Sequence, residues 1–392
     1  MNKKKIAVLT ATRAEYGLLR TVIKKLERSE YFQVELAVTG MHLSPEFGST
    51  YQEIEQDGLH IDNKIEILLS SDTSMAMSKA MGLALISFSE YFDRSKPDAV
   101  MVLGDRYEIL AVCCAAMNAR IPIFHLYGGE ATEGAIDEAI RHAITKMSFF
   151  HFTSTEAYRR RVIQMGEQPD RVFNVGAIGV ENALRETLMS KNELEKSLQF
   201  SLRRPYAVVT FHPVTLEDNT AEQQMQELLY AIDEHPEYLY LCTKANADAG
   251  GRMINRMWDE FAASRENVAV YESLGMIRYL SAVKYSIMVV GNSSSGIVEV
   301  PAFGIPTINI GDRQKGRVQA DSVINCQPDR VNISESIEIA QGTEFREVAK
   351  NTDNPYGKGN TSDTILSILE EHFATKSLNL KKEFFNLDFG EV

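Results

Sequence analysis

Four acidic residues lie close together in the stretch HLYGGEATEGAIDEAIRHAI, residues 125–144. They are Glu130, Glu133, Asp137 and Glu138, in a glycine-broken loop that runs into a segment with helical spacing. Carboxylates at a helix start complement the positive end of the helix dipole by a few tenths to ~1 kcal/mol each. Positioned carboxylates also serve as general acids and bases. Both interpretations are open here, and under the second the glycines would let the chain pass close beneath a ligand.

A stretch of small polar residues in the second half predicts an anion site. Residues 286–317 read SIMVVGNSSSGIVEVPAFGIPTINIGDRQKGR, in which a buried strand ends at Gly291 and a short helix must kink or end at Pro301. The helix start is formed by Asn292, Ser293, Ser294, Ser295 and Gly296. Backbone N–H groups and hydroxyls at such a start can approach an anion, which the helix dipole favours. One serine suffices for an N-cap, so three serines favour a diphosphate cradle.

Two further features extend this anion site. Glu299 lies four residues after Ser295, one beyond the capping-box spacing, and is placed to accept hydrogen bonds from sugar hydroxyls. The next strand ends in GDRQKGR, which carries Arg313, Lys315 and Arg317. Ligands of open α/β sheets bind at this carboxyl edge of the strands.

The first half places charged residues after its strands in the same way. Arg13 follows the first strand in TATRAEYG, and Asp105 and Arg106 follow a later strand in VLGDRYE. His125 ends the next strand and leads directly into the acidic stretch. These groups should therefore converge at one sheet edge. For Asp105, simple N-capping of the following helix is an alternative.

Polar residues also follow the first two strands of the second half. His212 in TFHPVT is either a turn residue before proline or a ligand-binding group. The loop KANADAGG, residues 244–251, is either a turn or a place where Asn246 and Asp248 read a base or ribose. His142 and His151 are predicted to pack in a helix and in a strand.

Apolar β-rich runs alternate with amphipathic segments along the whole chain, which predicts an α/β fold with parallel sheets and helical crossovers. Expected strands are Lys5–Thr10, Val34–Thr39, Ala99–Leu103, Ile121–Leu126, Phe149–Thr153 and Val172–Val175, then Tyr206–Phe211, Tyr238–Cys242, Val268–Tyr271, Ser286–Val290 and Thr307–Ile310. A charged helical segment near 181–204 marks the junction between predicted domains 1–180 and 181–392, with the last helix packing back on the first domain. A cleft between two such domains is a favoured ligand site.

Composition excludes several classes of protein. A chain of 392 residues with 44% hydrophobic residues suits two domains, and its net charge of −13 argues against nucleic acid as a partner. No apolar run approaches the ~20 residues that span a bilayer, and the lysine-rich start is interpreted as a buried strand, so we expect a cytoplasmic protein without membrane contact. The four cysteines show no zinc-ligand spacing, and neither GxGxxG nor a P-loop occurs, which disfavours metal sites, hydride-transfer enzymes and P-loop kinases.

Taken together, these motifs resemble the UDP-N-acetylglucosamine 2-epimerases, specifically the hydrolysing branch that makes N-acetylmannosamine for sialic acid synthesis. The resemblance covers TRAEYG, VTGMHLSPEFG, VLGDRYE, HLYGGE, IDEAIRHAITKMS, FHP, GNSSSGIVEVPAFG and NIGDRQKGR, in order along most of the chain. HLYGGE and IDEAIRH differ from the non-hydrolysing relatives, which look like HVEAGLR and PEExNR at these places. The resemblance implies two Rossmann-like domains in the GT-B arrangement, a UDP-sugar in the cleft, no cofactor or metal, and a homodimer or homotetramer.

The resemblance also implies a mechanism, in which UDP is eliminated to leave 2-acetamidoglucal and water then adds to this intermediate. Its acid, base and cation stabiliser would be Asp105, Glu130 and Asp137, with Glu138 as a substitute for Asp137. The implied substrate-binding residues are Arg13, Arg106, His212, Asn246, Ser293, Ser294, Ser295, Gly296, Glu299 and Arg313, of which Glu299 would take the ribose hydroxyls.

Three alternatives remain open at this stage. A sister group acts on UDP-diacetylbacillosamine with nearly the same motifs, a GT-B glycosyltransferase would share the UDP cradle, and a nucleotide-sugar sensor would bind without turnover. The apolar helix MSKAMGLALISFSEYF, residues 77–92, could serve either a partner or the core.

Overall fold

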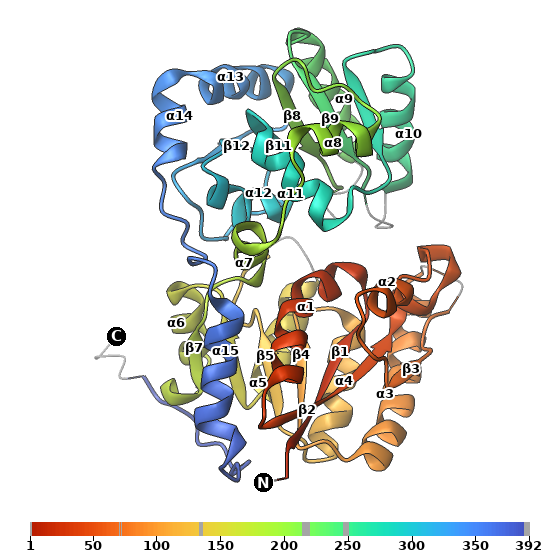
Figure 1. The fold of residues 1–392 in the computed structure, drawn as a ribbon, viewed down its shortest axis with the longest axis vertical. Coiled ribbons are helices and arrows are strands. Elements are labelled where there is room, and N and C mark those ends of the chain that lie inside the picture. Colours follow the sequence, from red (N-terminus) through yellow and green to blue (C-terminus); the bar gives the residue numbers. More distant parts are fainter. Residues whose placement is uncertain are drawn as a thin grey trace. The chain divides into compact units, whose positions relative to one another are not determined.

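A computed structural model describes residues 2–69, 71, 73–132, 136–213, 220–245 and 251–387. The chain forms two compact units, each a sheet covered by helices (Figure 1). Unit 1 takes its described residues from Met1–Glu130, Ile136–Ile178 and Asn360–Val392, and unit 2 from Ala131–Ala135 and Gly179–Gly359.

The described part of unit 1 contains a seven-stranded parallel sheet in the order β3-β2-β1-β4-β5-β6-β7. Its strands are β1 (Lys4–Thr10), β2 (Phe32–Thr39), β3 (Asn63–Ile65), β4 (Ala99–Leu103), β5 (Ile123–Leu126), β6 (Phe150–Thr153) and β7 (Val172–Asn174). Six of them match predicted strands to within two residues. The edge strand β3 was not predicted, because its three residues Asn-Lys-Ile carry no readable hydrophobic run.

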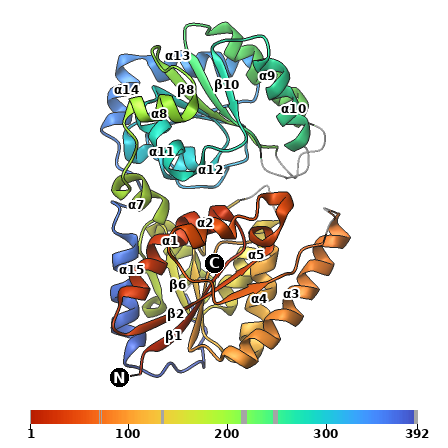
Figure 2. The same ribbon diagram turned by 45° about the vertical axis from the view of Figure 1, so that its right-hand side comes forward.

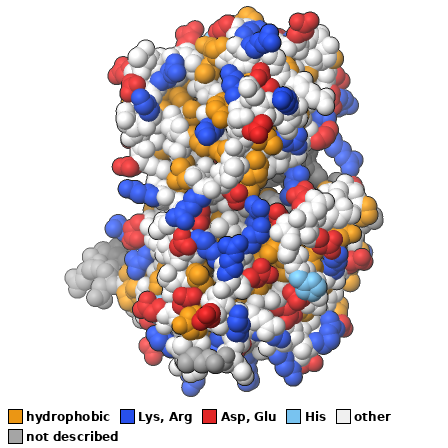
Figure 3. Space-filling model, viewed as in Figure 1, with side chains coloured by type: hydrophobic (Ala, Val, Ile, Leu, Met, Phe, Trp, Pro, Cys, Tyr) orange, Lys and Arg blue, Asp and Glu red, His pale blue; other side chains and the backbone are white. Residues whose placement is uncertain are grey.

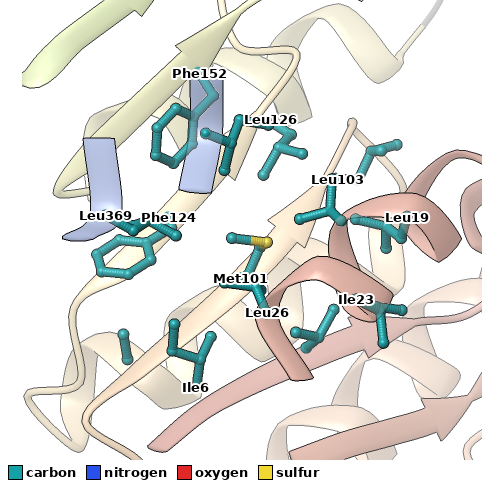
Figure 4. Packing of buried hydrophobic residues seen from close by; sticks show 14 of the residues in the cluster. Ile6, Leu19, Ile23, Leu26, Met101, Leu103, Phe124, Leu126, Phe152 and Leu369 are labelled. Carbon is teal, nitrogen blue, oxygen red and sulfur yellow. The ribbon is translucent and has the colours of Figure 1, made fainter. Parts of the chain in front are cut away.

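Helices cover both faces of this sheet, as Figure 2 shows from a second direction. They are α1 (Arg13–Arg28), α2 (Tyr51–Gln56), α3 (Ser74–Ser95), α4 (Tyr107–Asn118), α5 (Asp137–Met147), α6 (Glu156–Gln164) and α15 (Thr361–Leu369). Near the C-terminal end of the chain, α15 packs on unit 1, where Leu369 joins the same apolar cluster as Phe124 and Met101 (Figure 4). Phe373 adds a stacked contact with Phe32 at 6.2 Å between ring centroids.

Among the described residues, unit 2 contains a six-stranded parallel sheet in the order β10-β9-β8-β11-β12-β13. Its strands are β8 (Tyr206–Thr210), β9 (Leu239–Thr243), β10 (Val268–Tyr271), β11 (Met288–Gly291), β12 (Thr307–Ile310) and β13 (Val323–Cys326). The first five were predicted to within two residues. The edge strand β13 was missed, since its pattern VINC is only partly buried.

The helices of unit 2 are α7 (Ile178–Arg185), α8 (Lys191–Leu198), α9 (Ala221–Glu234), α10 (Gly251–Ala262), α11 (Gly275–Tyr285), α12 (Ser294–Val298), α13 (Arg330–Gln341) and α14 (Thr343–Lys350). The charged segment near 181–204, predicted as one helical stretch, is broken between α7 and α8. Helix α12 ends just before Pro301, and a 3₁₀ turn over Val300–Phe303 follows. Proline lacks the N–H that would continue an α-helix.

Both sheets have the doubly wound strand order, in which the chain starts centrally, winds to one edge and then returns to fill the other side. The direction reverses between β1 and β4 in unit 1, and between β8 and β11 in unit 2. Ligands of such sheets bind at the carboxyl ends of the strands that flank this switch point. The sequence places Arg13, Asp105 and Arg106 after β1 and β4, and His212 and the serine segment after β8 and β11.

The described part of the chain contains no helix long and apolar enough to cross a membrane. Within the same residues, no group of three or more His, Cys, Asp or Glu is arranged to hold a metal ion. Cys113 and Cys242 are buried, Cys114 and Cys326 are half-buried, and none forms a disulfide. Acidic and basic side chains both occur across the face shown in Figure 3.

Candidate active site

A buried arginine gathers the acidic residues of unit 1. Arg141 on α5 is only 2% exposed, and its guanidinium is ion-paired with the carboxylate of Asp105, which follows β4. The same group donates to Glu138 Oε2 at 2.8 Å and to the main-chain oxygen of Glu130 at 3.0 Å. Arg141 therefore fixes Asp105, Glu138 and the Glu130 backbone around one positive charge.

Sequence reasoning included Arg141 in a motif but gave it no role. The available signal was its helical spacing, because Arg141 lies three residues after Glu138 and four after Asp137, on the same helix face. The contact with Asp105 spans 36 residues of sequence, and no local pattern could indicate it.

Glu130 is held by a second partner. Its side chain is buried, and Oε1 accepts a hydrogen bond from the Ser154 hydroxyl at 2.6 Å.

Asp137 is the first residue of α5 and is half-buried, one position before Glu138. Glu138 also lies 3.1 Å from Nε2 of His142, while Glu133 is outside the described residues.

The two glycines before Glu130 serve the packing of the protein itself. A Cβ on Gly129, whose φ is +78°, would lie 2.6 Å from the main-chain oxygen of Tyr158 on α6. A Cβ on Gly128 would lie 3.0 Å from both His125 Nδ1 and Thr145 Oγ1. Both glycines are therefore required for the close approach of this loop to α5 and α6, and their expected role beneath a ligand stays a prediction.

The two predicted arginines of unit 1 differ in their surroundings. Arg13 is the first residue of α1, is half-exposed and lies 4.0 Å from Glu53. Arg106 donates through Nε and Nη2 to the buried carboxylate of Glu108, at 3.2 and 3.1 Å. Burial would lower the pKa of Arg106, but the charges of Glu108 and Glu15 outweigh it and raise the pKa. Arg106 is therefore charged and already paired within its own unit.

In unit 2, one buried asparagine connects the strands at the switch point. Asn292 Oδ1 accepts from the His212 main-chain N–H, and Asn292 Nδ2 donates to the His212 main-chain oxygen, both at 2.8 Å. The main-chain oxygen of Asn292 accepts from Arg313 Nη1 at 3.0 Å and from Gln314 Nε2 at 2.9 Å. The structure thus brings His212 and Arg313 together through Asn292, which sequence reasoning named only as part of a helix start.

His212 is held in its neutral form. Its side chain is buried, and this burial, together with the positive charge of Arg313, lowers its pKa to about 3. Its Nδ1 is buried and has no hydrogen-bond partner among the described residues. A neutral imidazole donates one hydrogen bond and accepts another, so this ring retains unused capacity.

The predicted cradle residues divide by role. The Ser293 hydroxyl caps α12 by accepting from the Ser295 N–H at 3.4 Å, which is the simple capping interpretation for this serine. Gly296 is required for packing, because a Cβ there would lie 2.8 Å from Thr307 Cγ2 on β12. Ser294 is exposed and Ser295 is half-buried.

Glu299 lies against a glycine that sequence reasoning did not single out. A Cβ on Gly179, at the start of α7, would lie 2.1 Å from Glu299 Oε1. The half-buried carboxylate is therefore placed by the backbone of α7. Asn246, the remaining predicted binding residue, lies outside the described residues.

Two Rossmann-like units with polar groups at their switch points define a nucleotide-binding class of α/β protein. A profile of the UDP-N-acetylglucosamine 2-epimerase family matches residues 24–370. The chain belongs to this family, and its relatives place it with the hydrolysing type.

Two curated relatives cover most of the chain. The polysialic acid biosynthesis protein P7 of Escherichia coli is 42% identical over 388 residues, which is 98% of each chain. The hydrolysing GDP/UDP-N,N'-diacetylbacillosamine 2-epimerase of Campylobacter jejuni is 40% identical over 348 residues, covering 88% of this chain and 90% of the relative.

Solved structures share the fold. The UDP-GlcNAc 2-epimerase of Neisseria meningitidis, bound to UDP-GlcNAc, aligns with a TM-score of 0.72 at 20% identity over 94% of this chain and 100% of the other. The enzyme of Methanocaldococcus jannaschii, in complex with UDP-GlcNAc and UDP, aligns with a TM-score of 0.76 at 20% identity over 94% and 99%. These comparisons confirm two Rossmann-like domains.

Proposed function

We propose that the protein hydrolyses and epimerises UDP-N-acetylglucosamine, yielding N-acetylmannosamine and UDP for sialic acid synthesis. The observation that carries this proposal is the Arg141 cluster, because it holds several carboxylates at the carboxyl edge of β4 and β5. Membership in the epimerase family and the 42% identity to a polysialic acid biosynthesis protein support the same function.

The chemistry requires UDP to leave before or while the C2 proton is removed. When the C1–O bond breaks, its electron pair leaves with UDP, and the positive charge at C1 acidifies the C2–H bond. A carboxylate then takes the C2 proton, and the C–H electron pair forms the C1=C2 double bond of 2-acetamidoglucal. The oxygen of water then adds to C1. C2 receives a proton on the face opposite to the one from which the first proton was removed, which gives N-acetylmannosamine.

In this proposal the acids of unit 1 perform the proton transfers. Asp105, Glu130 and Asp137 act as acid, base and cation stabiliser, with Glu138 as a substitute for Asp137. Carboxylates suit all three roles when their environments differ, as they do for Glu130 beside a hydroxyl and Asp105 beside a guanidinium. Arg141 is a positioning residue, since it acts by holding these groups.

The polar groups of unit 2 and Arg13 stabilise the departing UDP. Arg313 supplies positive charge and neutral His212 supplies a hydrogen bond, while Ser294 and Ser295 present hydroxyls to the diphosphate. Such preorganised groups are often the dominant catalytic contribution. Glu299 takes the ribose hydroxyls, and Arg106 and Asn246 complete the substrate contacts.

UDP-N,N'-diacetylbacillosamine is the second candidate substrate, favoured by the 40% identity to the Campylobacter enzyme. Its conversion would follow the same bond changes at C1 and C2.

One experiment distinguishes these possibilities. The protein is incubated in D₂O with each UDP-sugar alone, and the sugar is followed by proton NMR. We expect free N-acetylmannosamine carrying deuterium at C2 from UDP-N-acetylglucosamine. Product from only the diacetylated sugar would change the substrate assignment. Intact UDP-sugar in both tubes would reject the epimerase and favour a glycosyltransferase or a sensor.

A further inference from the structure

A short segment near the end of the described chain crosses back over unit 1. We call residues 382–385 the C-terminal strap, and Figure 1 shows this part of the chain, in blue, on the side of unit 1 that carries α6. The main-chain N–H of Phe385 donates to the Gly166 oxygen at 2.9 Å, just after α6. The Glu383 main-chain oxygen accepts from Gln168 Nε2 at 3.3 Å. Chain ends are usually poorly ordered unless contacts of this kind hold them.

The ring of Phe384 extends the strap to helix α5. A Cβ on Gly166, whose φ is +89°, would lie 2.2 Å from Phe384 Cε2, so a side chain there would displace the ring. The ammonium of Lys146, in the last turn of α5, lies 5.1 Å from the centroid of the same ring. A cation in this position is attracted by the face of an aromatic ring. The strap thus contacts both the turn after α6 and the last turn of α5.

Lys382 has a partner for each of its three N–H donors. Its ammonium lies 2.5 Å from Glu167 Oε2, and its side chain is only 24% exposed. It also donates to the main-chain oxygens of Lys146 at 3.1 Å and Ser148 at 2.7 Å. An ammonium carries three donors, so two of them are used at the C-terminal end of α5. Carbonyls at a helix end lack partners within the helix, and the helix dipole favours a cation there.

Glu167 does not by itself explain Lys382. This carboxylate is fully buried, and Lys146 Nζ lies 2.6 Å from its Oε1. His151 Nε2 lies 3.1 Å from its Oε2. Burial would raise the pKa of Glu167, but hydrogen bonds with His151, Lys146 and Lys382 outweigh it and lower the pKa to about 2. One lysine balances one carboxylate, so the second lysine is better explained by the carbonyls at the end of α5.

Helix α5 connects this end to the candidate active site. Its first turn holds Asp137 and Glu138, and Arg141 follows one turn later. Ile136, at the N-cap position, gives the helix no side-chain hydrogen bond. A helix of 11 residues is ~16 Å long and transmits position as a rigid element. An anchor at one end of α5 therefore affects where the acids at the other end lie.

We propose that Lys382 is a positioning residue, which anchors the C-terminal end of α5 and thereby keeps Asp137 and Arg141 in place for the reaction. The proposal rests on the proposed function, because it concerns the acids assigned there. A reacting group misplaced by ~1 Å can cost ~100-fold in rate. UDP binding is assigned to Arg13 and to unit 2, so loss of the anchor should lower kcat and leave UDP affinity unchanged.

The first test measures the anchor without any substrate. Lys382→Met is compared with Lys381→Met, which changes the neighbouring, exposed lysine. Amide hydrogen exchange over residues 137–147 should become at least ~10-fold faster in Lys382→Met, the value of about one hydrogen bond to a charged group, and stay unchanged in Lys381→Met. Lys382→Arg keeps a cation with several donors and should recover most of the protection. Unchanged exchange in folded Lys382→Met would overturn the anchor.

The second test measures turnover of UDP-N-acetylglucosamine at a temperature at which circular dichroism shows every variant folded. Lys382→Met should lower kcat at least ~10-fold and leave UDP affinity by calorimetry unchanged. Phe373→Leu alters the ring stacked on Phe32 and is the control for a general loss of stability in unit 1. Normal kcat in Lys382→Met, or an equally low kcat in Phe373→Leu, would overturn the positioning role.

A milder variant keeps the test valid if Lys382→Met does not fold. Phe384→Ala removes a ring that is 62% exposed and leaves the charges around Glu167 in place. Exchange over α5 should become faster and kcat should fall, each by a smaller factor than in Lys382→Met. Unchanged exchange and unchanged kcat in Phe384→Ala would overturn the role of the strap.

Exchange and turnover also separate this proposal from the proposed function. Intact UDP-sugar with the wild-type protein would reject the proposed function and, with it, the catalytic part of the present proposal. The anchoring of α5 would still be accepted or rejected by hydrogen exchange, which needs no turnover.

Discussion

The two units share a strand order but carry different chemistry at the corresponding sheet edges. After β4 and β5, unit 1 presents carboxylates that are tied to a buried arginine. After β8 and β11, unit 2 presents an asparagine, a neutral histidine and small residues, and its charged contribution comes from Arg313. The shared fold therefore supplies the place for a site, and the loop residues decide its chemistry.

The difference also shows how each edge is made rigid. In unit 1, one guanidinium reaches two carboxylates and a main-chain oxygen. In unit 2, one amide side chain joins two strand ends through two hydrogen bonds to the backbone of His212. A change at Arg141 should thus disturb charge, whereas a change at Asn292 should disturb backbone position.

The largest effect is expected for Arg141→Met. This change leaves Asp105 and Glu138 close together without their counter-charge, and removing one partner of a buried ion pair destabilises a protein by ~3–5 kcal/mol. Turnover should fall at least as far as it does on losing a proton-transfer group, ~100-fold. Urea unfolding and the rate of UDP release measure the two effects.

The control for this prediction is Arg160→Met on α6. Arg160 is 79% exposed and pairs with Glu156 at 3.5 Å on the surface, so the change should cost less than ~1 kcal/mol. If Arg141→Met were as stable and as active as Arg160→Met, the arginine-centred description of unit 1 would be wrong.

The second prediction separates chemistry in unit 1 from binding. Glu130→Gln keeps an acceptor for the Ser154 hydroxyl and leaves the main-chain contact with Arg141 intact. We expect unchanged UDP affinity by calorimetry and a loss of at least ~100-fold in kcat, the usual scale for a proton-transfer group. Asp105→Asn should also retain UDP binding and lose at least ~100-fold in turnover, though with some loss of stability. Near-wild-type kcat in Glu130→Gln would remove this residue from the catalytic set, and Glu156→Gln on the surface serves as its control.

The third prediction concerns the backbone connection in unit 2. Asn292→Ala leaves the buried main-chain N–H and carbonyl of His212 unpaired. Each unpaired group should lower the stability of the fold by ~1–3 kcal/mol. UDP affinity should fall, because His212 and Arg313 lose their common support. Asn309→Ala is the matched control, since the Asn309 side chain donates to Asn325 on β13 at 2.8 Å. Equal UDP affinity in the two variants would contradict a binding role for the Asn292 connection.

The strands were predictable because their hydrophobic runs are long and buried on both faces. Ala99–Leu103 and Thr307–Ile310 match the predicted limits of their strands. The edge strands β3 and β13 were not predictable, since partly exposed strands of three and four residues lack such runs. Pairing with a neighbouring strand, which is a long-range interaction, creates them.

The site was predictable only where a residue lies next to a strand end. Asp105 and His212 could be placed from their positions in the chain. The partners of these residues could not, because Arg141 reaches Asp105 across 36 residues and Asn292 reaches His212 across 80. Gly296 has a second requirement that the sequence did not indicate, because a Cβ there would lie 2.8 Å from Thr307 Cγ2 on β12.

The fourth prediction uses buried histidines, which occur in both units. Burial lowers the pKa of His125 to about 3 and of His42 to about 4 in unit 1, and burial with Arg313 lowers that of His212 to about 3 in unit 2. Below pH ~6.5 these histidines are protonated in the unfolded chain but stay neutral in the folded protein. Their contribution to the free energy of unfolding is therefore fully present above pH 6.5 and is lost as the pH falls towards 3–4. In this window each neutral ring lowers the free energy of unfolding by ~1.4 kcal/mol for every pH unit by which the pH falls.

Glu15 opposes this trend, because burial raises its pKa to about 7. As the pH falls from 7, the folded protein protonates Glu15 before the unfolded chain does, which stabilises the folded state. Burial also lowers the pKa of His151, so four buried histidines destabilise the fold as the pH falls and Glu15 offsets only part of their effect. The free energy of unfolding should therefore decrease between pH 6.5 and 5. Urea unfolding at several pH values measures this slope, and His125→Gln should reduce it by one histidine. A flat profile would show that these rings are protonated in the folded protein.

The smallest effect is expected within the serine segment, where two neighbouring hydroxyls should separate binding from stability. The Ser293 hydroxyl already accepts from the Ser295 N–H, so Ser293→Ala should cost ~1 kcal/mol of stability as a lost helix cap. Ser294 is exposed at the same helix start, and Ser294→Ala should leave stability unchanged and weaken UDP binding by roughly tenfold, the value of about one hydrogen bond to a charged group. Calorimetry with UDP and thermal unfolding of both variants test this division. Unchanged UDP affinity in Ser294→Ala would argue against a diphosphate cradle at α12, and the binding role of unit 2 would then rest on His212 and Arg313.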